Sequence, residues 1–270
     1  MTVKKNYFQK IDILFLCLYL LMIPLFASAA PPSLDVRSTP PLIIGTLLFN
    51  PPFETSDPKR NVYSGFEMDI MAAVCQRIKV QCKYVALPTL KTVFKALNEG
   101  QINVAVASLI VLKGDGEHVF STPYLPSGIQ FFVKKESNIN SIADIMQSKI
   151  GTINDPLIKI LVTVNYAKNY PVVIYDTAQA GIDDLAAGKI DVFVTQAASA
   201  KYWLSMIAGT FKLVGKPIPI GLGNGIMALT GTEPLINQIN QALFSMENDG
   251  TYARIYNRYG FFSETILIKE

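Results

Sequence analysis

Two stretches of this sequence decide the fold. Residues 96–103 read Ala-Leu-Asn-Glu-Gly-Gln-Ile-Asn, and residues 184–191 read Asp-Leu-Ala-Ala-Gly-Lys-Ile-Asp. In each stretch a helical pattern ends at a glycine, and a strand pattern follows it. A unit of this kind that occurs twice in the chain predicts two similar lobes.

The segments around residues 96–103 predict the core of one lobe. Strands are expected at residues 42–46, 82–86 and 103–107, where β-branched and apolar residues form short runs. Between the strands, apolar residues recur at helical spacing: Phe66, Ile70, Ala73, Val74 and Ile78, and then Val93, Phe94 and Leu97. This alternation is typical of an α/β fold with mostly parallel strands.

The same pattern continues in the second half of the chain. Strands are expected at residues 129–134, 149–152, 172–175, 191–195 and 225–230, and helices after Pro156, around Ile182 and after Thr232. A last helix carries Tyr252, Ile255, Tyr256 and Tyr259. We expect these tyrosines to pack in the core, because their spacing is helical.

The N-terminus has the order of a secretory signal peptide. Three lysines come first, an apolar stretch spans residues 13–26, and Ala27-Ser28-Ala29 follows. The sequence predicts export, with residues 1–29 removed by cleavage after Ala29. The alternative is a membrane anchor, but the apolar stretch is shorter than the ~20 residues of a spanning helix and contains Pro24.

The charge balance and the scarcity of metal-ligating side chains argue against several function classes. The chain has 24 basic and 21 acidic side chains, and loss of three lysines and Asp12 with the signal leaves 21 and 20. This balance gives no electrostatic footprint for nucleic acid. His118 is the only histidine, and we interpret Asp115, Glu117 and His118 as a solvated loop, so no metal and no cofactor are predicted.

Two cysteines, Cys75 and Cys82, remain after Cys17 leaves with the signal. An exported protein meets an oxidising compartment, which favours a disulfide between them. The alternative is a pair of buried free thiols.

Several motifs together resemble one known family. Gly45-Thr46 is followed by Pro51-Pro52-Phe53-Glu54, and residues 65–70 read Gly-Phe-Glu-Met-Asp-Ile. Residues 120–124 read Phe-Ser-Thr-Pro-Tyr, and residues 249–252 read Asp-Gly-Thr-Tyr. In order and spacing, and in the six residues between the cysteines, the chain resembles the periplasmic amino-acid-binding proteins of ABC importers (solute-binding protein family 3), which include the lysine/arginine/ornithine-binding protein.

The resemblance implies a two-lobed periplasmic-binding-protein fold of type II. Two crossings, near Ser127 and Pro219, would join the lobes. The first lobe would be discontinuous, with residues 36–127 and 219–270, and the second would span residues 128–218. Ligand would bind in the cleft and stabilise the closed form through its contacts with both lobes.

The residues that the family uses to recognise an α-amino acid are altered in this sequence. After the strand at residues 103–107 the family usually has an arginine, whereas this chain has Ser108 and then Lys113 as the nearby cation. A lysine cannot reproduce the bidentate fork of an arginine. Asp155 stands where an anion would be received, and Gln196 replaces an aspartate. The predicted ligand-binding residues are Asn50, Phe53, Leu90, Ser108, Lys113, Asn154, Asp155 and Gln196.

These observations favour a binding protein, not an enzyme. We expect a monomer that delivers a small polar solute to an ABC permease and ATPase. One alternative is an enzyme of the cyclohexadienyl dehydratase type, which shares the fold. Such an enzyme must bind the carboxylates of its substrate, and the missing arginine argues against this. Another alternative is a ligand sensor that signals to a separate membrane partner.

Overall fold

The computed structural model describes residues 40–112, 116–167 and 170–260. The predicted signal peptide at residues 1–29, and Lys113 and Asp115, lie outside these residues. Among the described residues, no helix combines the length and the apolar character that a membrane span requires.

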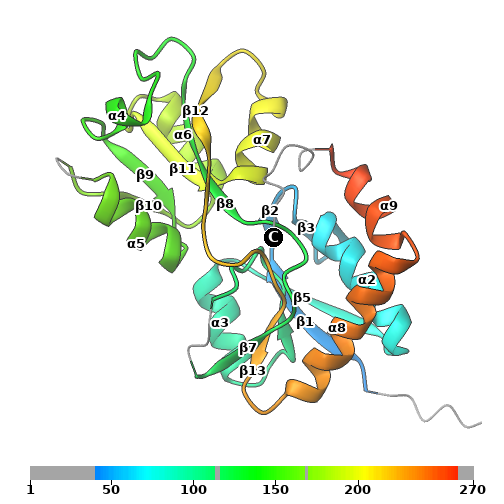
Figure 1. Ribbon diagram of the computed structural model, residues 1–270. Coiled ribbons are helices and arrows are strands. Elements are labelled where there is room, and N and C mark those ends of the chain that lie inside the picture. The colour runs from blue at the N-terminus through cyan, green and yellow to red at the C-terminus, as the bar shows by residue number, and fades with distance from the viewer. Residues whose placement is uncertain (1–39, 113–115, 168–169, 261–270) are drawn as a thin grey trace, which may run out of the picture. The chain divides into compact units, whose positions relative to one another are not determined.

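The first sheet has five strands, of which three are parallel (Figure 1). Its order is β5 (Cys82–Leu87), β1 (Leu42–Leu47), β6 (Val104–Ala105), β13 (Met227–Leu229) and β7 (His118–Phe120). β13 runs antiparallel to both of its neighbours. The strand β6 is shorter than the predicted 103–107.

The second sheet repeats this arrangement. Its order is β10 (Val173–Tyr175), β9 (Ile150–Ile153), β11 (Val192–Gln196), β8 (Gly128–Lys134) and β12 (Phe211–Pro219). β10, β9 and β11 are parallel, whereas β8 is antiparallel to both β11 and β12. In each sheet the first parallel strand in sequence lies between the second and the third. The prediction of two similar α/β lobes is therefore confirmed.

The chain passes between the two sheets twice. β7 belongs to the first sheet and β8 to the second, and the return occurs between β12 and β13. We call the elements around the first sheet the first lobe, and the segment from β8 to β12 the second lobe. The fold is two-lobed with two crossings, as predicted.

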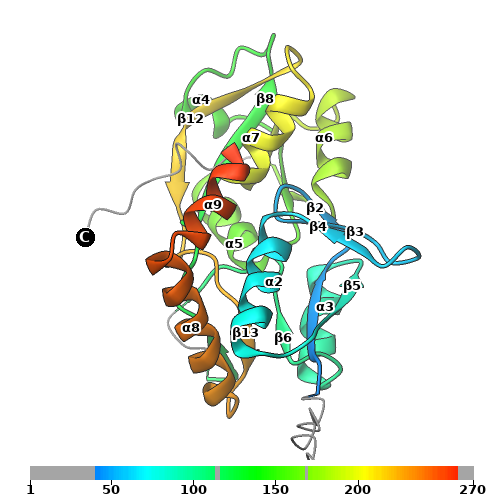
Figure 2. The same cartoon turned by 90° about the vertical axis from the view of Figure 1, so that its right-hand side faces the viewer.

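Helices cover both faces of the first sheet (Figures 1 and 2). Ile44 of β1 packs in a core with α2 (Phe66–Ile78), α8 (Glu233–Asn248) and α9 (Thr251–Arg258). Ile43 points to the opposite face, toward α3 (Leu90–Asn98). The predicted packing role of the tyrosines is confirmed, because the rings of Tyr252, Tyr256 and Tyr259 surround Phe66.

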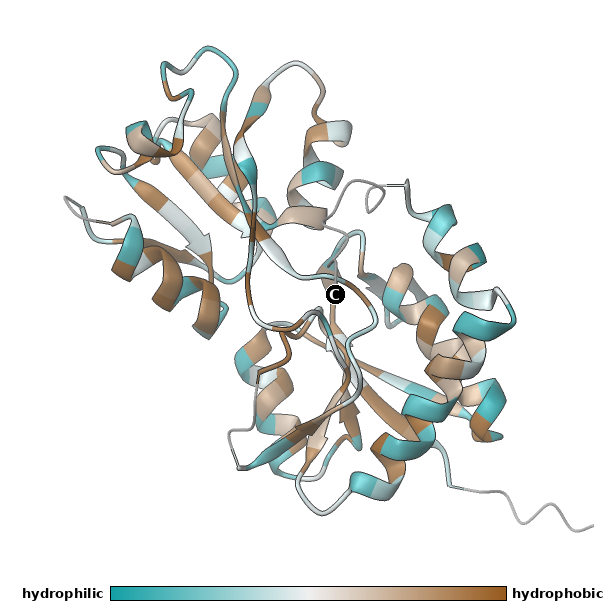
Figure 3. Cartoon of the chain, in the orientation of Figure 1, coloured by the Kyte–Doolittle hydropathy of each residue, from teal (hydrophilic) through white to brown (hydrophobic). Residues whose placement is uncertain are grey.

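The second lobe also has a core on each face of its sheet. Phe131 packs toward α4 (Ile142–Ile145) and α5 (Pro156–Asn165). Phe132 and Phe193 pack toward α6 (Ala178–Ala186) and α7 (Ala197–Met206). Neighbouring residues of one strand point to opposite faces, so strands covered on both sides are hydrophobic throughout. Figure 3 shows this hydrophobic character along the strands.

A small antiparallel sheet adds polar residues to the first lobe. It consists of β2 (Phe49–Asn50), β3 (Glu54–Asp57) and β4 (Val62–Ser64). The sequence patterns predicted neither this sheet nor β7, α7 and β12.

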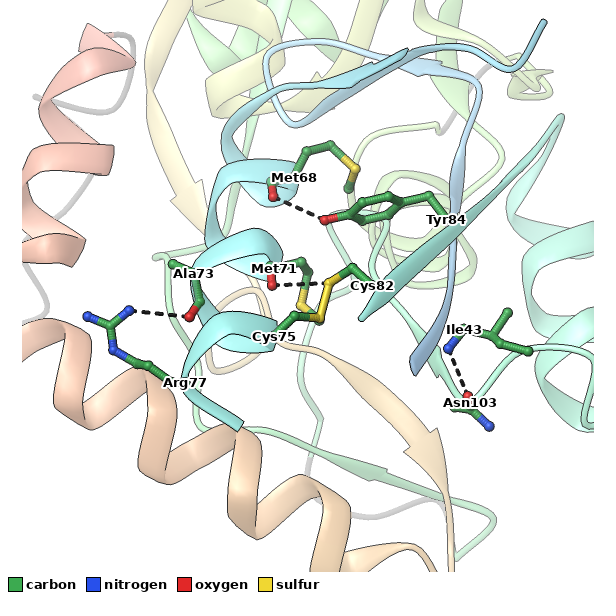
Figure 4. The surroundings of a disulfide bond; sticks show 9 residues. All are labelled: Ile43, Met68, Met71, Ala73, Cys75, Arg77, Cys82, Tyr84 and Asn103. Atoms are coloured by element: carbon green, nitrogen blue, oxygen red, sulfur yellow. Dashed lines mark hydrogen bonds between the residues drawn. A yellow bond between two sulfur atoms is a disulfide. The ribbon is translucent and has the colours of Figure 1, made fainter. Parts of the chain in front are cut away.

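The cysteine pair forms the predicted disulfide (Figure 4). Cys75 lies near the end of α2 and Cys82 begins β5, and their Cα atoms are 5.9 Å apart. The short connection includes Lys79, whose left-handed φ of 58° ends the helix. The bond fixes the turn between α2 and the edge strand of the first sheet.

Replacing both cysteines with alanine (C75A/C82A) should lower the free energy of unfolding. The chain-entropy relation for a loop of this length gives about 2 kcal/mol, which corresponds to a loss of roughly 4–8 °C in melting temperature at this chain size. Calorimetry with and without a reductant checks this. The reductant should destabilise the wild type and leave the variant unchanged, and equal melting temperatures of the oxidised wild type and the variant would contradict the stabilising role.

Candidate functional site

Ser108 lies at the carboxyl end of the parallel part of the first sheet. It follows β6 by three residues, is 6% exposed and has a φ of 51°. This left-handed conformation is uncommon for a residue other than glycine and costs about 1 kcal/mol. Surrounding contacts must therefore hold the residue in place.

Hydrogen bonds fix both sides of the Ser108 peptide. Its N–H donates to both carboxylate oxygens of Glu67 on α2, each at 2.9 Å. Its carbonyl oxygen accepts from Gln196 Nε2 at 2.7 Å and from Asn224 Nδ2. Gln196 ends β11 of the second lobe, and Asn224 lies on the return crossing between β12 and β13. Both lobes and one crossing thus meet at a single residue.

The Ser108 hydroxyl adds a second set of contacts. Its Oγ is 3.0 Å from Asn50 Nδ2 and 3.2 Å from Gln196 Nε2. The structure therefore brings three of the predicted candidates together. β6 and β11 occupy equivalent positions in the two sheets, and ligands of open α/β sheets bind beyond the carboxyl ends of such strands.

Two buried glutamates lie behind these residues. Glu54 and Glu67 are 0% exposed, and Glu54 Oε1 accepts from Asn50 Nδ2 at 3.1 Å. Tyr124 donates a short hydrogen bond to Glu67 Oε1. We call the set the Ser108 cluster, and its members are Asn50, Glu54, Glu67, Ser108, Tyr124, Gln196 and Asn224.

Sequence reasoning found only part of this cluster. Glu54, Glu67 and Tyr124 stand in the sequence only as members of the family motifs, which do not indicate that the three side chains meet. Asn224 gave no sequence signal, because it lies in a crossing that has no periodic pattern. In the folded protein Asn224 is completely buried, and its Nδ2 donates to the Ser108 carbonyl oxygen and to Gln196 Oε1.

Two other candidates lie at the start of α5. Asp155 is buried and caps this helix, because its Oδ1 accepts from the N–H groups of Leu157 and Ile158 at 2.9 and 3.0 Å. Burial raises the pKa of Asp155, and the two N–H groups oppose this shift. Asn154 is exposed and donates to Asp176. The helix N-terminus, a natural anion site, is thus occupied by a carboxylate of the chain itself.

The structure does not bring the remaining candidates into the cluster. Phe53 is 1% exposed and belongs to the core of the first lobe. Leu90 is half-buried against the core under α3. No side-chain hydrogen bond places either residue in the Ser108 cluster, and Lys113 lies outside the described residues.

A cavity of about 210 Å³ begins at Leu109 and Ile110, directly after Ser108. Its lining from the second lobe comes from the start of α5, including Asp155, and its lining from the first lobe includes Phe94 and His118. Apart from Asp155 and His118, the lining side chains are apolar. The cavity is thus a mainly apolar space with walls from both lobes.

The arginines of the described region are engaged elsewhere. Arg60 pairs with Asp57, Arg77 with Asp249, and Arg258 with Asp69. Arg254 donates to Thr251. Within the ranges that the structure describes, no arginine joins the Ser108 cluster.

Comparison with known proteins gives the family. The model of the bacterial extracellular solute-binding proteins, family 3, matches residues 42–262. The chain belongs to this family. A crystal structure of an arginine transport-system periplasmic binding protein from Legionella pneumophila is 32% identical to this family-3 chain, with a TM-score of 0.74. The similarity covers 81% of this chain and 99% of that one.

Other relatives of this family-3 protein are similar along most of their length. The arginine-binding periplasmic protein of Mannheimia haemolytica is 26% identical, covering 77% of this chain and 86% of the relative. The L-arginine-binding protein of Pseudomonas aeruginosa is 25% identical, covering 90% and 93%. An ancestral arginine-binding protein bound to arginine has a TM-score of 0.74 at 26% identity, covering 83% and 99%. These similarities support the type II two-lobed fold.

The conformation of Ser108 gives a prediction with a matched pair of variants. Ser108→Ala and Ser108→Gly both remove the hydroxyl, but only glycine adopts a φ near 50° without steric cost. We expect the glycine variant to be more stable than the alanine variant by about 1 kcal/mol.

Urea unfolding of the two variants measures this difference directly. The wild type provides the reference for the hydrogen bonds lost with the hydroxyl. An alanine variant as stable as the glycine variant, or more stable, would show that Ser108 is not held against its conformational preference.

Proposed function

We propose that this family-3 protein is an extracytoplasmic solute-binding protein that closes on a small polar ligand between its lobes. The observation that carries the proposal is the Ser108 cluster, in which Gln196 of the second lobe reaches the peptide and hydroxyl of Ser108 in the first. The partner in this proposal is the permease and ATPase of an ABC importer. The names of the relatives, which are binding proteins, support this assignment.

The geometry of the cluster supports closure on a ligand. The hydrogen bonds between Gln196 and Ser108 join the lobes directly, and the nearby cavity has walls from both lobes. A ligand that enters between the lobes replaces some of these bonds with its own. It stabilises the closed form only to the extent that it makes more contacts there than in the open form.

The polar side chains that the two lobes contribute to the cluster also indicate which kind of ligand would bind. Asn50, Ser108 and Gln196 offer amide and hydroxyl groups, which recognise uncharged donors and acceptors. Asp155 occupies the N-terminus of α5, and the described arginines pair elsewhere. We therefore propose a ligand that is recognised without an arginine–carboxylate fork, unlike a standard α-amino acid.

The proposal includes the remaining predictions from the sequence. Export would remove residues 1–29 after Ala29, and the lobes would comprise residues 36–127 with 219–270 and residues 128–218. The protein would act as a monomer and without catalysis. The ancestral precursor of cyclohexadienyl dehydratase among the similar structures is 22% identical and supports the fold alone.

Titration calorimetry with free arginine, lysine, histidine and glutamine tests the proposed ligand chemistry. We expect no saturable binding at micromolar concentrations, because the charged recognition groups are replaced. Micromolar binding of any of the four would contradict the proposed ligand class and would still agree with a solute-binding function.

Native mass spectrometry of protein purified without refolding tests binding itself. We expect a retained small molecule on the wild type. Its occupancy should be at least about tenfold lower on Gln196→Ala, since this variant loses the uncharged side-chain amide that joins the second lobe to Ser108 in the closed form. Gln101→Ala, which removes an exposed amide on the first lobe, is the matched control. Equal occupancy of the three proteins would place the ligand outside the Ser108 cluster.

A further inference from the structure

The two buried glutamates of the Ser108 cluster form an unusual pair. Both are 0% exposed, and they meet the same neighbours: Glu54 Oε1 accepts from Asn50 Nδ2, which also contacts Ser108 Oγ, and Glu67 accepts from the Ser108 N–H. Within the part of the chain that the structure describes, no ion pair with a lysine, arginine or histidine involves either one. Two adjacent carboxylates without a cation would be strongly disfavoured in such a position.

A hydrogen bond between two carboxyl groups requires a proton, since an ionised carboxylate only accepts. The contacts of each oxygen show where this proton resides. Glu67 accepts from the Ser108 N–H with both oxygens and from Tyr124 with Oε1, so it acts as the acceptor. Glu54 Oε1 accepts from Asn50, whereas Glu54 Oε2 is buried and no donor of the protein bonds to it. Oε2 is therefore the oxygen that is left to carry the proton.

We propose that Glu54 and Glu67 hold one proton between them, on Glu54 Oε2, and that this pair positions Asn50 and Ser108 in the site. The ionised Glu67 holds the Ser108 N–H and with it the left-handed conformation of that residue. The protonated Glu54 donates to Glu67 and, through Oε1, orients the Asn50 amide toward the Ser108 hydroxyl. Both glutamates are positioning residues, and the inference is independent of the ligand.

The surroundings agree with this distribution of charge. Burial and then the charge of Glu67 raise the pKa of Glu54 well above its usual value. Burial also raises the pKa of Glu67, but hydrogen bonds from Glu54, Tyr124 and Ser108 oppose that shift. The other titratable groups facing the pair are Tyr124 and, behind it, Tyr252, and burial raises the pKa of both hydroxyls. These tyrosines therefore stay neutral donors near neutral pH.

The shared proton determines the pH dependence of stability. A carboxyl group whose pKa is raised by folding contributes stability below its unfolded pKa of about 4.3, and this stability is lost as the pH rises toward the folded pKa. Glu54→Gln mimics the protonated acid, because its amide can donate to Glu67 and accept from Asn50. Above the unfolded pKa, the wild type releases the Glu54 proton when it unfolds, whereas the glutamine of the variant has no such proton to release.

The test compares melting temperatures of the wild type, Glu54→Gln and Glu67→Gln from pH 5 to pH 8. We expect the Glu54→Gln curve to rise relative to the wild type by about 3 °C for each pH unit. Glu67→Gln also replaces a glutamate with a glutamine, but here the amide replaces the carboxylate that accepts from the Ser108 N–H with both oxygens. Its melting temperature should fall by at least about 6 °C at pH 6.

Infrared spectroscopy at pH 7 provides a second measurement that does not depend on the stability of Glu67→Gln. The wild type should show the carbonyl band of a protonated carboxylic acid, and Glu54→Gln should lack it. Parallel pH profiles of the wild type and Glu54→Gln, or a wild type without this band, would overturn the proposal. So would equal losses of stability in the two glutamine variants.

Discussion

The position of the Ser108 peptide is the constraint on which the site depends. Glu67 holds its N–H from within the first lobe, and Gln196 and Asn224 hold its carbonyl from the second lobe and the return crossing. These contacts keep a serine in a conformation that favours glycine. The same residue therefore links the interior of one lobe to the surface of the other, so a change of lobe arrangement must alter its hydrogen bonds.

The repeated sheet arrangement explains why these residues meet. In each sheet the third parallel strand, β6 or β11, lies next to an antiparallel strand that adjoins a crossing, β13 or β8. Ser108 follows β6 in the first sheet, and Gln196 ends β11 in the second. Loops at the carboxyl ends of parallel strands lie on one edge of a sheet, where ligands of α/β proteins bind. The fold thus places two polar residues from equivalent positions opposite each other.

Much of this fold could be predicted from local patterns. Buried strands such as β8 and β11 consist of consecutive apolar residues, and helices such as α8 have a single apolar face and a proline near the start. The helix α7 escaped prediction because its small and aromatic residues give no clear polar face: the sequence of Ala197–Met206 is AASAKYWLSM. β6 is short because the chain turns toward Ser108 soon after Ala105, which no periodicity reveals.

The site was less predictable for a physical reason. Asn50, Ser108 and Gln196 could be found because the resemblance to the family places its recognition residues at these strand ends. Asn224 and Tyr124 are brought into the cluster by chain crossings whose course depends on tertiary packing. The pairing of Glu54 with Glu67 depends on burial, and a sequence does not state which of its carboxyl groups lacks a cation.

Amide hydrogen exchange at Ser108 measures whether the second lobe helps to hold this peptide. We expect strong protection of the Ser108 N–H in the wild type, and exchange at least about tenfold faster in Gln196→Ala, with the amides of β1 unchanged. Equal exchange at Ser108 in the two proteins would contradict it, since Glu67 alone would then be sufficient to fix the residue.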